Sequence, residues 1–229
     1  AFLAPALVVG ATGAWHLLRR RDSPHVRTMF SMALGMILVT APIQAVIGDL
    51  HGLNTAEHQP AKLAAMEGHW ENRPGVGMPL ILFGWPDMTR EETRFAVEIP
   101  RLGSVILTHS WDGQVPGLKD FAPQDRPNAT IVFWTFRTMV GLGLLMILLG
   151  IAGQVVRMRG RLYRSRTLMR FALAMGPSGL IAILAGWYTT EVENPGEGWW
   201  TRTGDWVVNT RWFPNGLEEL SDHCHSHGL

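Results

Sequence analysis

One stretch of the chain is crowded with residues that could do chemistry. It runs from Gly48 to Glu71, reads GDLHGLNTAEHQPAKLAAMEGHWE, and follows an apolar run without charged residues. A lysine ammonium can donate hydrogen bonds to ligand oxygens, and a carboxylate can accept a proton as a general base. Lys62 and Glu67 supply such a pair, but they are five residues apart and therefore lie on different faces of an ideal helix. A solvated amphipathic helix at the surface would explain the same residues without any chemistry.

The local sequence predicts how this stretch is positioned. The segment AKLAAMEGHWE is rich in helix formers, and the Gln59-Pro60 pair before it is typical of a helix start. We therefore expect a short helix that carries both Lys62 and Glu67.

Four apolar blocks predict an all-α integral membrane protein. Mean hydropathy is only +0.09, but the apolar residues are concentrated in separate runs, each near the ~20 residues that a spanning helix needs. The blocks are Ala1 to Leu18, Thr28 to Gly48, Ala129 to Val156 and Phe171 to Thr190. We expect about four transmembrane helices, with a long loop on the outer side between the second and the third.

The arginines predict the orientation in the membrane. They gather at residues 19–21 and 157–166, and the positive-inside rule places both segments on the cytoplasmic side. The Gly48 to Glu71 stretch then lies near the outer surface. A net charge of +1 says nothing about a nucleic-acid partner, since the basic residues are not spread along a face, and we expect none. The single cysteine, Cys224, excludes an intramolecular disulfide and a CxxC-type metal site.

The same residues carry a family resemblance. The string from Gly48 to Glu71 closely resembles the start of the quinol-binding loop in subunit I of the cytochrome bd quinol oxidases, particularly the short-loop, cyanide-insensitive type. The phrases FGWPD, IP and VPGLK in the loop are also similar to that family. VPGLKDF leads almost directly into the next apolar block, so the long insertion of some family members is absent.

The resemblance implies a function. The chain would be part of subunit I of a terminal respiratory oxidase in a bacterial inner membrane, which oxidises quinol at a periplasmic loop and reduces O2 to water. Residues 1–48 and 129–190 would each form two transmembrane helices, residues 49–128 the quinol-binding loop, and residues 191–229 an atypical tail. Lys62 would hold the quinol oxygens and Glu67 would accept a proton. The implied cofactors are two haems b and a haem d, or a further haem b, and the implied partner is a smaller membrane subunit II.

Two residues of the third apolar block are candidates for a haem environment. Arg137 lies inside the block, where a charge costs ~2.5 kcal/mol or more unless it meets a partner, so we expect a haem propionate, another side chain or water beside it. Met139 is by default a gap-filling side chain. The phrase FRTMVG, however, resembles the family's FRxMVG, which implies that Met139 is an axial ligand of the low-spin haem b.

Two further candidates lie at the end of the fourth apolar block. Taken alone, Glu191 is most simply a solvated acid. The phrase GWYTTE resembles a family phrase, which implies that Glu191 serves the high-spin haem b and that Trp187 packs nearby.

The chain departs from the family at both ends. No histidine precedes His16, which is placed like an interfacial residue, so the family's axial histidine of the low-spin haem is missing. No GRQPW-like motif follows Glu191. A divergent tail or a reading-frame error would explain the amino-acid sequence after this residue. We therefore expect a C-terminal fragment of subunit I that neither binds haem nor turns over alone. The tail segment Asp222 to His227 has metal-ligand residue types, but they are packed too tightly to enclose a metal without distant partners.

A second function class remains open. A non-catalytic membrane transporter or assembly subunit could use the same outer loop to bind a partner. In that case Lys62 and Glu67 are freely replaceable, and no redox spectrum depends on Met139.

Overall fold

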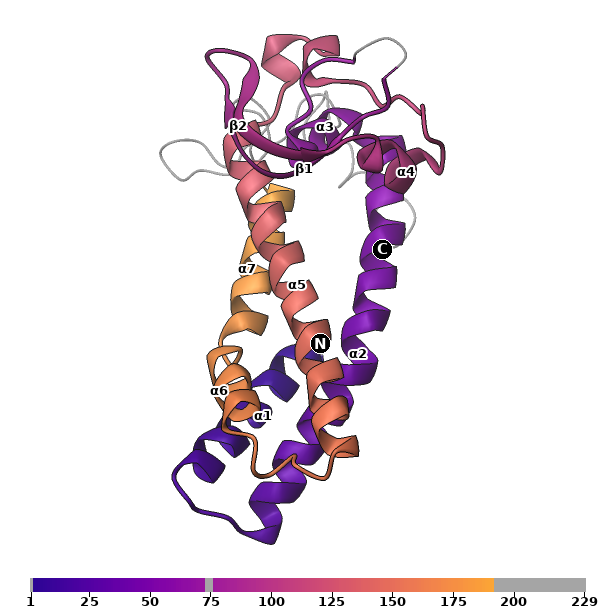
Figure 1. The fold of residues 1–229 in the computed structure, drawn as a ribbon. Coiled ribbons are helices and arrows are strands. Elements are labelled where there is room, and N and C mark those ends of the chain that lie inside the picture. The colour runs from indigo at the N-terminus through magenta and orange to yellow at the C-terminus, as the bar shows by residue number, and fades with distance from the viewer. Residues whose placement is uncertain (1, 73–75, 192–229) are drawn as a thin grey trace, which may run out of the picture.

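The computed structural model describes residues 2–72 and 76–191, which form a helical bundle capped at one end by a small loop region (Figure 1). The bundle helices are α1 (Leu3–Leu18), α2 (Pro24–His58), α5 (Ala129–Met158), α6 (Arg166–Ala174) and α7 (Ser178–Glu191). The cap comprises α3 (Pro60–Glu67), β1 (Leu80–Asp87), β2 (Glu92–Ile99), α4 (Leu102–Thr108) and the 3-10 turns η1 (Leu118–Asp120) and η2 (Pro123–Asp125).

The bundle core is apolar and closely packed. Helix α1 packs on α2 and α6, while α5 packs on both α2 and α7. Phe30, Leu34 and Ile37 of α2 are fully buried in this core. At the α2–α5 contact a Cβ on Gly150 would lie 2.8 Å from the Cα of Leu38, so only glycine lets the two backbones approach this closely.

Three helical segments of the described chain are long and apolar enough to cross a membrane. They are α2, α5 and the α6–α7 pair taken together over residues 166–191, whereas α1 is apolar but only 16 residues long. The predicted all-α membrane architecture is confirmed. The fourth apolar block is, however, not one continuous helix. It is interrupted between Ala174 and Ser178, because Pro177 has no N–H to donate and cannot continue the helix.

Helix α2 extends ten residues beyond Gly48, into the polar stretch. It ends only where Gln59, which precedes a proline, leaves the helical region with φ −136° and ψ 61°. The expected short helix then begins at Pro60. It stops at Glu67, one turn earlier than the sequence predicts, because Gly68 adopts the left-handed conformation with φ +63°.

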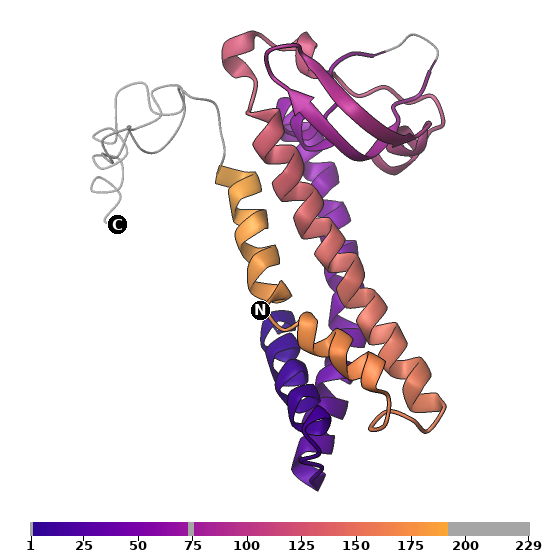
Figure 2. The same cartoon turned by 60° about the vertical axis from the view of Figure 1, so that its left-hand side comes forward.

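An antiparallel hairpin that the sequence analysis does not predict lies across this end of the bundle (Figures 1 and 2). Strands β1 and β2 pair with Leu80 opposite Ile99 and Asp87 opposite Glu92. The Asp87 carboxylate closes the turn by accepting hydrogen bonds from the hydroxyl and amide of Thr89 and from the amide of Arg90. The Thr89 hydroxyl, followed by the two amides, holds the pKa of Asp87 below its usual range.

Candidate functional site

A buried ion pair joins the end of α3 to α5. Nη2 of Arg137 lies 2.7 Å from Oε2 of Glu67, and the two side chains are 14% and 8% exposed. Glu67 is the last residue of α3, and Arg137 lies about two turns into α5. The partner that the sequence analysis requires for Arg137 is thus another side chain, supplied by the polar stretch itself.

Arg137 has further contacts that fix its position. Its Nε donates a hydrogen bond of 2.9 Å to the carbonyl oxygen of Ile81 in β1. Its guanidinium carbon lies 4.8 Å from the ring centre of Phe133 and 5.4 Å from that of Phe136. Such cation–π contacts favour a guanidinium at a partly desolvated site. One arginine therefore connects α3, α5 and the hairpin.

Lys62 is buried on another side of α3. Its Nζ donates a hydrogen bond of 2.6 Å to the carbonyl oxygen of Thr190, near the end of α7. Carbonyls in the last turn of a helix have no partner within the helix, so a lysine there meets an available acceptor. Glu67 contacts α5 while Lys62 contacts α7, which agrees with the different helix faces expected for residues five apart.

A hydroxyl from the hairpin fixes the chain just after Glu67. Thr93 of β2 donates a hydrogen bond of 2.7 Å to the carbonyl of Gly68 and accepts one of 3.1 Å from Nε1 of Trp70. His69 is also buried, and its Nε2 lies 2.9 Å from Oδ1 of Asn72. The sequence analysis missed these residues. The phrase EGHWE could have indicated Trp70, but nothing near Thr93 in the sequence indicates its role.

Three of the candidate haem residues, Met139, Trp187 and Glu191, are on α5 and α7. Met139 is half-buried on α5, and its Sδ would lie 2.8 Å from a Cβ placed on Gly186 of α7, so the thioether packs over that glycine. Trp187 is exposed, with its ring 5.8 Å from that of Tyr188, and Glu191 is exposed at the end of α7. The structure therefore brings Lys62, Glu67 and the haem candidate Arg137 into one region. Glu191 directly follows Thr190, the residue that accepts the Lys62 hydrogen bond, while Met139 and Trp187 take other positions on α5 and α7.

The donor set for a metal or haem is small in the part of the chain that is described. Within residues 2–72 and 76–191 no three His, Cys, Asp or Glu side chains come together as a metal site would require. A methionine thioether on a membrane helix is suitable chemistry for one axial position of a haem. Met139 thus fits as a single donor. The tail segment Asp222 to His227 lies outside the described residues.

Apolar spans that end in a cap with buried Lys62 and Glu67 define a multi-pass membrane protein with a polar site at one membrane surface. Residues 1–195 match the model of the family described as cytochrome bd terminal oxidase subunit I, and the chain belongs to this family. The resemblance to subunit I of the cytochrome bd oxidases is thereby confirmed. The chain is a multi-pass protein of the bacterial inner membrane.

Individual relatives agree with this assignment. The chain is 29% identical to the cytochrome bd-II ubiquinol oxidase subunit 1 of Escherichia coli (strain K12), over 83% of this chain and 49% of that protein. It is 33% identical to a putative cytochrome bd menaquinol oxidase subunit I of Bacillus subtilis (strain 168), over 82% and 43%. The fold is similar to that of the bd oxidase from Geobacillus thermodenitrificans, with a TM-score of 0.71 and 30% identity over 83% and 44% of the two chains. The chain spans about half the length of the relatives it matches.

Proposed function

We propose that this chain contributes the quinol-binding part of subunit I in a quinol:oxygen oxidoreductase, together with a smaller subunit II. Residues 49–128 form the quinol-binding loop on the periplasmic side in this proposal. The observation that supports it best is the buried carboxylate of Glu67, on the short helix that also buries Lys62. Burial of two ionisable groups on one eight-residue helix costs folding free energy, and such burial is typical of binding and catalytic sites.

The proposed roles follow from the contacts of each side chain. Quinol oxidation releases two protons, and a carboxylate beside the ring can accept one proton at a time and release it to the outer aqueous side before the next. Glu67 takes this role, and Arg137 orients its carboxylate from the α5 side. Lys62 donates hydrogen bonds to the quinol oxygens. When quinol binds, these bonds replace the hydrogen bond from Lys62 to the Thr190 carbonyl. The exchange replaces one buried acceptor by another and leaves the ammonium satisfied.

Haem is the other component of the proposal. Two haems b and a haem d, or a further haem b, would supply one-electron acceptors and the oxygen chemistry. Met139 would supply a thioether ligand to the low-spin haem b, and Arg137 and Trp187 would line the haem environment. Glu191 is the proposed residue at the high-spin haem b. Thioether ligation raises the reduction potential of a haem, which suits an acceptor of electrons from quinol.

The quinol assignment is tested by activity of the complete oxidase. We expect Glu67→Gln to lower the maximal rate strongly and Lys62→Gln to raise the quinol KM. The matched control is Glu71→Gln, the same substitution four residues further on at a largely exposed side chain. If the maximal rate and the quinol KM of the Glu67 and Lys62 variants both equal those of Glu71→Gln, these residues are replaceable. The transporter or assembly hypothesis is then favoured.

The haem assignment is tested by a reduced-minus-oxidised optical spectrum. We expect Met139→Leu to abolish or shift the low-spin haem b band. Met146→Leu, a substitution seven residues along the same helix at a position buried in the bundle core, should leave the band unchanged. Equal spectra for both variants would assign Met139 to packing alone.

A further inference from the structure

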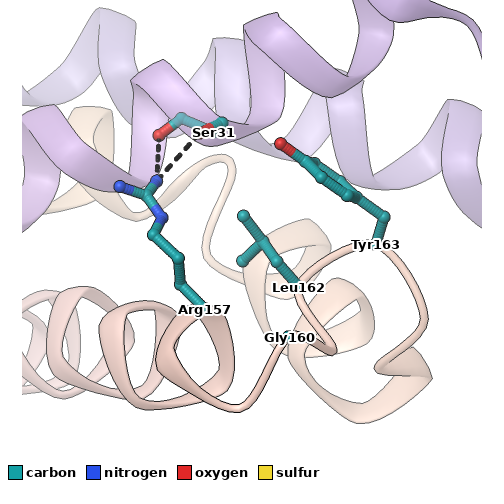
Figure 3. A pocket seen from close by; sticks show the side chains of 5 residues that line it. All are labelled: Ser31, Arg157, Gly160, Leu162 and Tyr163. Atoms are coloured by element: carbon teal, nitrogen blue, oxygen red, sulfur yellow. Dashed lines mark hydrogen bonds between the residues drawn. The ribbon is translucent and has the colours of Figure 1, made fainter.

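A pocket lies at the end of the bundle opposite to Glu67. It has a volume of about 230 Å³ and is lined by Ser31 of α2, by Arg157 near the end of α5, and by Gly160, Leu162 and Tyr163 of the segment that follows (Figure 3). Gly160 has φ +65°, and a Cβ placed on it would meet no atom within 4 Å. The chain therefore turns away after α5 and leaves space beside α2.

The polar groups of the pocket are hydrogen-bond donors. Nη2 of Arg157 donates to the carbonyl oxygen of Ser31 at 2.7 Å and to its hydroxyl at 3.0 Å. Nε of Arg157 is buried and has no partner among the described residues. The Tyr163 hydroxyl faces Ser31 from the other side of Leu162 (Figure 3). Because Nε is enclosed by the chain, an anion in the pocket would meet the outer N–H groups of the guanidinium, and an oxyanion is the partner that a guanidinium binds best.

The charges around the pocket also favour an anion. Residues 19–27 and 157–170, which flank it, hold ten arginines and a single acidic residue, Asp22. Asp22 is already paired with Arg27 at 2.5 Å, and the guanidinium carbon of Arg27 lies 5.3 Å from the ring centre of Tyr163. The surroundings of the pocket are therefore strongly positive.

The apolar surface next to the pocket indicates which kind of molecule contains the anionic group. Met32 and Met36 are exposed on α2 within two turns of Ser31, and Ile151 and Val155 are exposed on α5 within two turns of Arg157. These helices are long and apolar enough to span a membrane, so apolar side chains exposed on them are suited to contact with acyl chains. Basic pockets between spanning helices on the cytoplasmic side are a known setting for lipid headgroups.

We propose that this pocket binds the phosphate of an anionic phospholipid, with Arg157, Ser31 and Tyr163 as its donors. The acyl chains lie along the apolar surface of α2 and α5. The proposal does not depend on the quinol site, which lies at the other end of the bundle.

The test is native mass spectrometry of the complete complex, released from nanodiscs of equimolar phosphatidylcholine and phosphatidylglycerol. We expect selective retention of phosphatidylglycerol. Arg157→Gln should lower its retention about fivefold, the effect of one cation near an anionic headgroup. Tyr163→Phe should lower it about threefold through loss of one hydrogen bond. The matched control is Arg159→Gln, which removes the same charge from an exposed position two residues away.

Three results would overturn the proposal. Equal losses for Arg157→Gln and Arg159→Gln would show attraction to surface charge without a site. Equal retention of the two lipids would show that the pocket does not select an anion. Displacement of phosphatidylglycerol by an equal concentration of inorganic phosphate would identify a soluble anion as the occupant. Tyr163→Phe keeps the ring below Arg27, so it tests the pocket even if Arg157→Gln fails to fold.

Discussion

Two carboxylate–arginine pairs lie at opposite ends of the bundle and differ in almost everything except their chemistry. Glu67 and Arg137 are 70 residues apart in sequence and nearly buried. Asp22 and Arg27 are five residues apart, and their side chains are 39% and 51% exposed. The exposed pair needs only the start of one helix to form. The buried pair needs α3, α5 and the hairpin to be in place, so its loss affects several elements at once.

Removal of one member of the buried pair should have the largest effect on stability. Arg137→Leu leaves the Glu67 carboxylate buried without its partner, and we expect a loss of about 3–5 kcal/mol in stability. The measurement is the apparent melting temperature of the complex in detergent. The double variant Arg137→Leu with Glu67→Leu should recover most of the loss, because no buried charge then remains. A single variant no less stable than the double variant would contradict the interpretation.

Lys62 provides a second buried charge on the same helix. Lys62→Met removes the hydrogen bond to the Thr190 carbonyl, and we expect a loss of about 1.5–3 kcal/mol, the value typical of a charged donor. The control is Lys119→Met, which removes the largely exposed ion pair with Glu71. Equal melting temperatures for both variants would mean that burial does not distinguish these two lysines.

Thr93 is a neutral, half-buried side chain in the same region as Glu67 and Arg137. Thr93→Val deprives the Trp70 N–H and the Gly68 carbonyl of their common partner, and we expect a loss of about 1–3 kcal/mol. Thr93→Ser keeps the hydroxyl and should restore most of the stability. The two variants are compared by melting temperature and by proteolysis of the loop. Equal behaviour would assign the effect to the Thr93 methyl group.

The exposed pair should give the smallest effect. Arg27 hydrogen bonds hold the pKa of the Asp22 carboxyl below its usual range. Because folding lowers this pKa, the contribution is complete above the pKa of Asp22 in the unfolded chain and disappears as the pH falls through its pKa in the folded protein. We expect Asp22→Asn to match the wild type closely near neutral pH, since solvent screens the pair, and any difference to vanish in acid. A large loss at neutral pH would show that this pair is as important as the buried one.

The sequence predicted the features that depend on local composition. The apolar blocks predicted the bundle helices, and the Gln59-Pro60 pair predicted the start of α3. The requirement of Arg137 for a partner followed from the cost of a charge in a membrane helix. The identity of that partner could not be predicted, because Glu67 is distant in sequence and a haem propionate, another side chain and water were equally acceptable.

The remaining features depend on tertiary contacts. The hairpin forms around the turn at Asp87. In the two strands the alternation of apolar and polar residues is too irregular to indicate strands from the sequence. Thr93 acts through Gly68 and Trp70, which the hairpin brings close only after folding. The extension of α2 to His58 was missed because its last ten residues are polar, and hydropathy marks where a span leaves the membrane, not where the helix ends.

The length of α2 sets how far the cap stands from the bilayer centre. A helix of 35 residues is about 52 Å long, against about 30 Å for the hydrocarbon layer. Helix α2 therefore projects well into the headgroup zone and carries α3 with it. In the proposed oxidase, the quinol ring leaves the hydrocarbon layer to reach Glu67 while the isoprenoid tail remains in that layer. Protons that Glu67 accepts there reach the outer aqueous side without crossing the hydrocarbon layer.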